Sequence, residues 1–488
     1  MQIVWFKRDL RIYDHAPLVE AVKRGQVLPL YIIEPKLWQQ PDMSYRHYAF
    51  LSECLGELNR DLTRLGQPLV IRVGEAVEVL EDLARRYEVE ALHAHQETWN
   101  GWTYKRDLQV KQWCEVNQVP WFAPRQHGVM RGAHDRDGWA RQWYNMMSQP
   151  ALPAPEALAS VNIESDAIPT AESLGLKDDN CTQRQKGGRT EGLKLLDSFL
   201  YQRGMGYTKE MSSPVTAYES CSRISAYLAF GCLSMREVYH ASQARTQNIT
   251  DMPRGNKGKW SSAMRSFSGR LRWHCHFMQK LEDEPRIEYE PFHSAYDGIR
   301  DGAFNEMHFQ AWKEGRTGYP MVDACMRALI ATGWLNFRMR AMLMSFASYH
   351  LWLDWRPTSL YLATLFTDYE PGIHYSQAQM QSGTTGINVI RIYNPIKQGR
   401  DHDPDGLFIR EWLPELKDMP QEFIHTPWMA QSKMNGYPLP IVDEKTARKA
   451  AADILYAMRR NIEHRQEAIG IVKKHGSRKR PPRKASSR

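Results

Sequence analysis

The chain contains few cysteines, and none of them stands at a spacing typical of a metal site. The seven cysteines are Cys54, Cys114, Cys181, Cys221, Cys232, Cys275 and Cys325. No two show the C-x-x-C spacing of zinc and iron–sulfur sites, and their number is odd. We therefore expect reduced thiols and no bound metal.

Long apolar stretches are also absent. The longest nearly apolar run, residues 341–353, is too short to cross a bilayer and fits a buried helix. The chain starts on a predicted strand, with no leader-like segment before it. We expect a cytoplasmic protein with no membrane partner.

The body of the chain carries no net charge. Of the 64 Lys and Arg, eight lie in residues 473–488, which contain no acid; without them 56 basic residues balance 56 acidic ones. The net charge of +8 is therefore a property of the tail. A basic tail with Pro and Ser is typical of a disordered segment, suited either to phosphate backbones or to solubility alone.

A glycine-rich phosphate loop is missing after the first predicted strand. Residues 3–6 (IVWF) predict a buried strand, and Lys7, Arg8, Asp9 and Arg11 follow it directly. Dehydrogenases and NTPases place a G-x-G-x-x-G or P-loop turn at this point. The absence argues against both classes, and we expect these charged residues to tie the turn to neighbouring structure.

Apolar runs alternate with helical patterns through the first 125 residues. The predicted strands are 3–6, 27–33, 68–73, 91–95 and 119–124, with helices at about 16–24, 46–65, 76–88 and 103–117. This alternation predicts a doubly wound parallel sheet. Beyond residue 190 helical periodicity dominates, so the fold class is α/β followed by all-α.

Four units are predicted along the chain. They are an α/β domain (1–130), a connector (131–190) that is rich in Pro, Ala and Ser from about 148, a helical domain (191–470) and a basic disordered tail (471–488).

Four motifs, in the same order, resemble the photolyase/cryptochrome family of blue-light flavoproteins. They are WFKRDLRIYDHAPL (5–18), SRISAYLAFGCLS (222–234), QAWKEGRTGYPMVDACMRAL (310–329) and IRIYNPIKQGRDHDPDGLFIREWLPEL (390–416). The resemblance implies an N-terminal antenna domain and a helical domain that binds FAD. It also implies light-driven electron transfer from reduced FAD, which repairs pyrimidine dimers in DNA or drives signalling.

The resemblance also assigns residues to the flavin. They are Tyr207, Cys221, Ser222, Arg223, Ile224, Ser225, Trp273, Arg340, Asp368, Glu370 and His374. Physical arguments support two groups: Ser222 and Ser225 start a predicted helix whose N-terminus suits an anion, and an Arg340–Asp368 fork is directional. An ordinary helix cap, a structural salt bridge and, for Trp273, a core aromatic are the alternatives.

The usual electron relay of three tryptophans is interrupted. Trp355 matches its middle member, whereas Ala378 and Gly302 align with the other two. We assign catalytic roles to Trp355, Trp273 and His374, the last facing the flavin from a loop at 372–386. Other routes could use Trp352, Trp334, Tyr369, Tyr375 or Tyr393.

Positions that contact the dimer in repair enzymes also differ. Arg270 replaces a Glu, and Phe337 and Ala341 replace Asn and Met. His274 and His276 lie two apart, so on a helix they point to different sides. These departures keep a cryptochrome photoreceptor open as the alternative to a photolyase-like lyase.

DNA is the expected partner. The candidate contacts are Arg270, Arg338, Arg391 and Lys397, together with the tail. We expect a monomer with FAD and leave a second, antenna chromophore of unknown identity open. Because no Cys follows Cys325, we expect no C-terminal iron–sulfur cluster.

Overall fold

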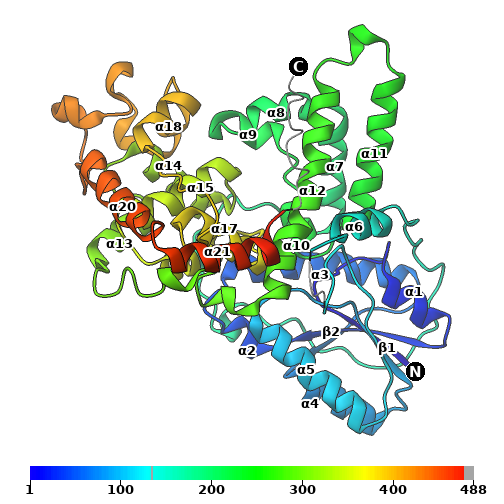
Figure 1. The fold of residues 1–488 in the computed structure, drawn as a ribbon. Coiled ribbons are helices and arrows are strands. Elements are labelled where there is room, and N and C mark those ends of the chain that lie inside the picture. Colours follow the sequence, from blue (N-terminus) through cyan, green and yellow to red (C-terminus); the bar gives the residue numbers. More distant parts are fainter. Residues whose placement is uncertain (133–135, 478–488) are drawn as a thin grey trace, which may run out of the picture.

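An N-terminal α/β domain is followed by a larger helical domain (Figure 1). The computed structural model describes residues 1–132 and 136–477. The predicted order, α/β and then all-α, is confirmed. Within the described ranges, no helix is both long and apolar enough to cross a membrane.

One parallel sheet organises the first domain. Its strands are β1 (Gln2–Phe6), β2 (Val27–Ile33), β3 (Val70–Val73), β4 (Ala91–His93) and β5 (Trp121–Phe122). They lie in the order β3-β2-β1-β4-β5, with Gln2 opposite both Val27 and Ala91. The order reverses between β1 and β4, as in a doubly wound sheet.

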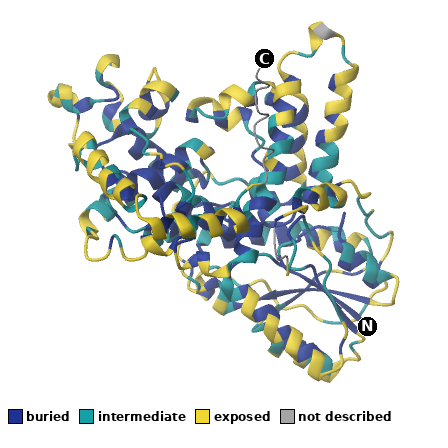
Figure 2. Cartoon of the chain, viewed as in Figure 1, coloured by how far each residue is buried: buried dark blue, intermediate teal, exposed yellow. Residues whose placement is uncertain are grey.

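Helices cover both faces of this sheet. They are α1 (Ala16–Val22), α2 (Pro35–Trp38), α3 (Tyr45–Arg64), α4 (Ala76–Arg86) and α5 (Gly101–Val116). Side chains alternate along a strand, so Ile3 and Trp5 pack in one core with residues of α4 and α5. Val4 and Phe6 point the other way, into a core that continues through the helical domain. Figure 2 shows this buried interior.

Within the described residues, helices are the only regular elements of the second domain. They are α7 (Arg189–Tyr201), α8 (Tyr207–Glu210), α9 (Pro214–Ser220), α10 (Ser225–Ala229), α11 (Met235–Asp251), α12 (Trp260–Asp283), α13 (Glu306–Lys313), α14 (Pro320–Thr332), α15 (Phe337–Ser345), α16 (Trp355–Leu365), α17 (Pro371–Ser382), α18 (Pro395–His402), α19 (Leu407–Trp412), α20 (Glu444–Met458) and α21 (Ile462–His475). A π-helix, Phe346–His350, extends α15.

Three elements differ from the sequence prediction. The connector contains a helix, α6 (Trp139–Met147), whose buried Trp139, Trp143 and Met147 recur every fourth residue. The predicted loop at 372–386 is largely helix α17. The tail was predicted to begin at residue 471, but residues 471–475 are the last turn of α21 and His475 is buried. Residues 478–488 of the predicted tail lie outside the described residues.

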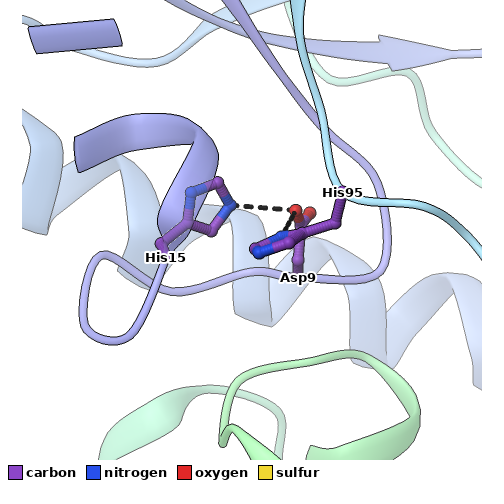
Figure 3. Close-up of side chains that lie close together, drawn as sticks. All are labelled: Asp9, His15 and His95. Carbon is purple, nitrogen blue, oxygen red and sulfur yellow. Dashed lines mark hydrogen bonds and ion pairs between the residues drawn. The ribbon is translucent and has the colours of Figure 1, made fainter. Parts of the chain in front are cut away.

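The charged turn after β1 forms a buried hydrogen-bonded cluster (Figure 3). Asp9 Oδ2 accepts hydrogen bonds from His15 Nε2 at 2.9 Å and from His95 Nδ1 at 2.7 Å. His15 also accepts the backbone N–H of Leu18 and so caps α1. Burial opposes the charge on Asp9, but the two imidazoles hold the pKa of its carboxyl well below the ordinary value.

The same turn joins the two domains. Arg11 Nη1 donates to the Gly231 carbonyl at 2.9 Å, and the Leu10 N–H donates to the Phe230 carbonyl at 3.2 Å. The Arg8 guanidinium lies 4.8 Å from the centre of the Phe230 ring. These contacts agree with the predicted structural role of the charged run.

Close approach at the domain junction requires glycine at position 231. Gly231 has φ +67°, and a Cβ there would lie 2.2 Å from the Arg8 carbonyl oxygen. Both the backbone conformation and the space therefore exclude a side chain.

Gly231→Ala should destabilise the protein by at least about 3 kcal/mol, because the clash is with backbone that cannot move aside. Urea unfolding measures the change. Gly470→Ala is the matched control: this glycine lies within α21 with nothing within 4 Å of an added Cβ, so Ala should be neutral or slightly stabilising. Equal unfolding midpoints for the two variants would contradict the domain-junction account.

Candidate functional site

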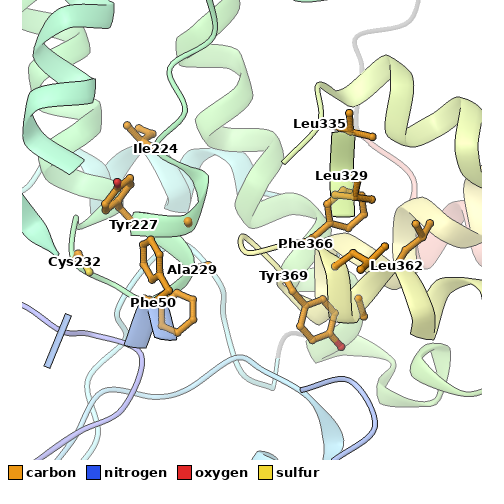
Figure 4. Packing of buried hydrophobic residues seen from close by; sticks show 14 of the residues in the cluster. Phe50, Ile224, Tyr227, Ala229, Cys232, Leu329, Leu335, Leu362, Phe366 and Tyr369 are labelled. Atoms are coloured by element: carbon orange, nitrogen blue, oxygen red, sulfur yellow. The ribbon is translucent and has the colours of Figure 1, made fainter. Parts of the chain in front are cut away.

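A cavity of about 460 Å³ opens among α8, α10, α12 and α15–α17 in the helical domain. Part of its surroundings appears in Figure 4, where Leu335, Phe366 and Tyr369 lie across from Ile224 and Tyr227. The predicted residues on its wall are Tyr207, Cys221, Ser222, Arg223, Ser225, Arg340, Asp368, Glu370 and His374. The volume is within the range of pockets that hold small molecules and cofactors.

The segment from Cys221 to Ser225 is stabilised by hydrogen bonds from Arg203 and not by a serine cap. Ile224 occupies the N-cap position of α10 and no side chain caps it, so the expected Ser222 cap is wrong. Arg203 donates to the carbonyls of Cys221 and Ser222 instead, the second at 2.8 Å. An extended chain leaves these carbonyls free, and a guanidinium with five donors can satisfy both.

Arg223 has an unusual backbone conformation, and its side chain is held against two aromatic rings. Its backbone is left-handed, with φ +59°, and its guanidinium lies 3.7 Å from the Tyr218 ring centre and 4.3 Å from that of Trp334. Gln185 hydrogen-bonds both its carbonyl and its Nε. A cation is thereby fixed on the cavity wall.

Arg340 and Asp368 form a two-pronged ion pair on the cavity wall. The two N···O distances are 2.9 and 2.8 Å, and Arg340 Nε donates to the Leu335 carbonyl at 2.7 Å. Burial would raise the pKa of the Asp368 carboxyl, but Arg340, helped by Ser225, keeps it below the ordinary value. The charged pair is therefore intact at neutral pH.

One face of α17 forms a wall of the cavity. Glu370, at its N-cap, and then Ile373, His374, Gln377 and Gln381 recur at helical spacing and all face the cavity.

The helix packs closely on α12 through Gly372. A Cβ at this glycine would lie 2.6 Å from the Met278 Cα, so the two backbones meet without an intervening side chain.

His374 faces the cavity as a neutral imidazole. Burial lowers the pKa of His374 to about 4. Its Nε2 donates to the Ser359 carbonyl at 2.8 Å. Nδ1 of this tautomer is consequently a hydrogen-bond acceptor.

His274 forms an ion pair with Glu370 at the edge of the cavity. His274 Nε2 and Glu370 Oε2 are 2.6 Å apart. Burial works against the charged imidazole, but the adjacent carboxylate raises the pKa of His274 to about 10. His276 points elsewhere, toward Arg136 and Trp139, so the two histidines act separately, as their spacing predicts.

Several predicted site residues lie away from the cavity. Ile224 is buried at 2 % exposure. Trp273 packs on His276 and Phe277 of its own helix and is not among the residues that line the wall, so its contact with the flavin stays a prediction. Trp355 is buried and is not among the residues that line the wall; its ring centre lies 6.5 Å from that of Tyr375. Lys397 is exposed on α18 and paired with Asp401.

Arginines dominate the charged groups at the cavity. Arg270, Arg338 and Arg391 reach it in addition to Arg223 and Arg340, whereas the carboxylates on the wall are Asp368 and Glu370. Arg270 and Arg391 are exposed, so they are available to a ligand that enters from solvent.

Some wall residues were not placed on the wall from the sequence. These are Trp334, Asn336, Tyr369, Gln377, Gln381 and Tyr393. Those on α17 share the helical spacing of Glu370 and His374, and would have been found had this segment been predicted as a helix.

The ion pair of His274 and Glu370 should make stability depend on alkaline pH. The raised folded pKa of His274 contributes stability that is complete below its ordinary value near 6.5 and is lost as pH rises through about 10. In wild type, the free energy of unfolding should therefore fall between pH 7 and 10 by on the order of 2–4 kcal/mol more than it does in Glu370→Gln. Chemical unfolding at the two pH values measures this difference. Parallel losses in the two proteins would contradict the pairing.

Comparison with known proteins matches both halves of the chain. The pattern for the FAD binding domain of DNA photolyase matches residues 267–457, and the DNA photolyase pattern matches residues 2–135.

Individual relatives match over nearly the whole chain. A deoxyribodipyrimidine photo-lyase of Salmonella typhimurium is 30% identical, covering 94% of this chain and 99% of the relative. A cryptochrome DASH of Gloeobacter violaceus is 28% identical, covering 90% and 93%. A solved archaeal photolyase from Sulfolobus tokodaii, described with two FAD molecules, is 28% identical with a TM-score of 0.78, covering 95% and 100%. The chain belongs to the photolyase/cryptochrome family and contains its FAD-binding domain.

Proposed function

We propose that this protein is a photolyase-like lyase that uses FAD and blue light to repair pyrimidine dimers in UV-damaged DNA. The observation that carries the proposal is the cavity itself, with a charged Arg340–Asp368 pair on its wall and further arginines around it. The similarity of the whole chain to photolyases supports the proposed class of reaction.

The polar groups of the cavity fit FAD. Three of the buried polar atoms without a hydrogen-bond partner belong to residues on its wall, namely Asn336 Oδ1, Arg338 Nε and Gln377 Oε1. Amide oxygens accept from ring N–H groups, and guanidinium donors suit phosphate and carbonyl oxygens. A flavin nucleotide offers all of these partners.

The residues of the wall would hold and orient this cofactor. FAD, when bound, supplies light absorption and single-electron transfer. Arg340, fixed by Asp368 and Leu335, presents a cation to electron-rich ring atoms. His374 presents a neutral Nδ1 acceptor, and Arg223 presents a positive charge to the diphosphate.

DNA would approach the arginines at the cavity opening. Arg270 and Arg391 are exposed and suit backbone phosphates, which bind cations without regard to sequence. A damaged nucleotide would have to leave the base stack to enter the cavity. A neutral protein body is compatible with this arrangement, because a local cationic surface is enough.

A cryptochrome-type photoreceptor without repair is the second candidate. The observation that favours it is Arg270. This cation lies at the cavity, at the position where the family resemblance implies a Glu in enzymes that repair dimers. A second chromophore, as in the relative described with two FAD molecules, is compatible with either candidate.

A repair assay distinguishes the two candidates. Reduced, FAD-loaded protein is mixed with a UV-irradiated oligonucleotide and exposed to blue light, and restored thymines are counted by chromatography and mass spectrometry. We expect turnover of cyclobutane or (6-4) lesions in light and none in the dark. Absence of turnover for both lesions would remove the repair function and leave the photoreceptor.

Arg340→Ala should weaken FAD binding roughly 10- to 100-fold, since a hydrogen bond from a charged group contributes about 1.5–3 kcal/mol. Flavin fluorescence titration of the apoprotein gives the dissociation constant. Arg327→Ala is the control, because it breaks an equally two-pronged pair with Glu415 away from the cavity. Equal losses in both variants would mean a general folding defect and not a cofactor contact.

A further inference from the structure

One tyrosine on the cavity wall is hydrogen-bonded to a buried carboxylate from the other domain. Tyr369, just before α17, is 2 % exposed, and its hydroxyl donates to Asp42 Oδ2 at 2.8 Å. Asp42 lies between α2 and α3, is 4 % exposed and also accepts Asn100 Nδ2 at 3.0 Å. The α/β domain thus supplies a base to the wall of the cavity.

This arrangement has a specific chemical use. A phenol that loses an electron becomes a strong acid, so its oxidation is easy only where the proton can leave at the same time. A carboxylate within hydrogen-bond distance provides that acceptor, and it does so without any movement of the chain. The position of Asp42 therefore makes Tyr369 a better electron donor than an isolated tyrosine.

The nearby tryptophans are less suited to lose an electron. The Arg223 guanidinium lies 4.3 Å from the ring centre of Trp334, which is on the cavity wall. The Arg8 guanidinium lies 3.3 Å from the ring centre of Trp99, which packs against Tyr369 at 5.3 Å. A cation on the face of an indole repels the positive charge that oxidation would create there.

The other tyrosines of the wall lack a comparable base. Tyr207 and Tyr393 also face the cavity. Among the hydrogen bonds of the described residues, neither hydroxyl donates to a carboxylate, whereas that of Tyr369 does.

We propose that Tyr369 gives an electron to the flavin bound in this cavity and that Asp42 accepts its phenolic proton. One electron moves from the phenol to photoexcited oxidised flavin, the O–H bond breaks, and the proton moves to Asp42 Oδ2. A thiolate in solution then gives one electron to the tyrosyl oxygen and becomes a thiyl radical, two of which couple to a disulfide, and the proton returns from Asp42 to the phenol. The inference rests on the proposed function, because FAD is the oxidant.

Tyr375 connects this donor to the buried Trp355. The hydroxyls of Tyr369 and Tyr375 are 3.4 Å apart, and the ring centres of Tyr375 and Trp355 are 6.5 Å apart. Trp355 is therefore a more distant member of the same aromatic row, and the first electron comes from Tyr369.

The test combines spectroscopy with substitution. FAD-loaded protein is illuminated, frozen and examined by electron paramagnetic resonance, with and without ring-deuterated tyrosine. We expect a tyrosyl signal that narrows on deuteration, is lost in Tyr369→Phe and persists in Trp355→Phe. Flavin photoreduction with excess thiol should be roughly 100-fold slower in Asp42→Asn, the lower end of what a positioned proton acceptor supplies.

Tyr48→Phe is the matched control. It removes the hydroxyl of another buried tyrosine, which donates to the Pro169 carbonyl at 2.7 Å away from the cavity, and it should keep both signal and rate. A signal that does not narrow in the labelled wild-type protein overturns the inference, even if Tyr369→Phe fails to fold. An unchanged rate in Asp42→Asn also overturns it. Failure of the wild-type protein to bind FAD would overturn the proposed function first, and this inference with it.

Discussion

The contact between the turn after β1 and the turn at Gly231 fixes the relative position of the two domains. Arg11 and the Leu10 N–H reach the carbonyls of residues 231 and 230, and Gly231 lets the backbones touch. The cavity segment Cys221–Ser225 ends a few residues before this glycine. The same contact therefore positions part of the cavity wall. Asp42 meets Tyr369 beside a second contact between the domains, in which Arg46 and His47 donate to the carbonyls of Leu365 and Phe366.

Much of the fold could be predicted because its signals are local. Alternating apolar residues with turn residues between them identified all five strands, and their order along the chain implied a parallel sheet. α17 was missed because its sequence contains Pro371, Gly372 and several polar residues, which are typical of a loop. Its helix is stabilised by packing on α12, a contact that is not visible in a short stretch of sequence.

The site could be predicted only in part, for a similar reason. Arg340 and Asp368 were assigned by the family resemblance, and the structure joins them directly. Ser222 was expected to cap a helix, but the chain turns so that Arg203 satisfies the backbone there. Asp42 and Tyr369 are 327 residues apart, and no pattern in either segment points to the other. Contacts of this kind arise from the domain arrangement, not from local sequence.

The crossing of α12 and α17 at Gly372 has a mechanical consequence. With the Met278 backbone so close that a methyl group has no room, neither helix can slide along the other without separating from it. Arg270 and His274 on one helix and Glu370 and His374 on the other then behave as parts of a single stiff body. A ligand that pushes on either helix would therefore tilt both together.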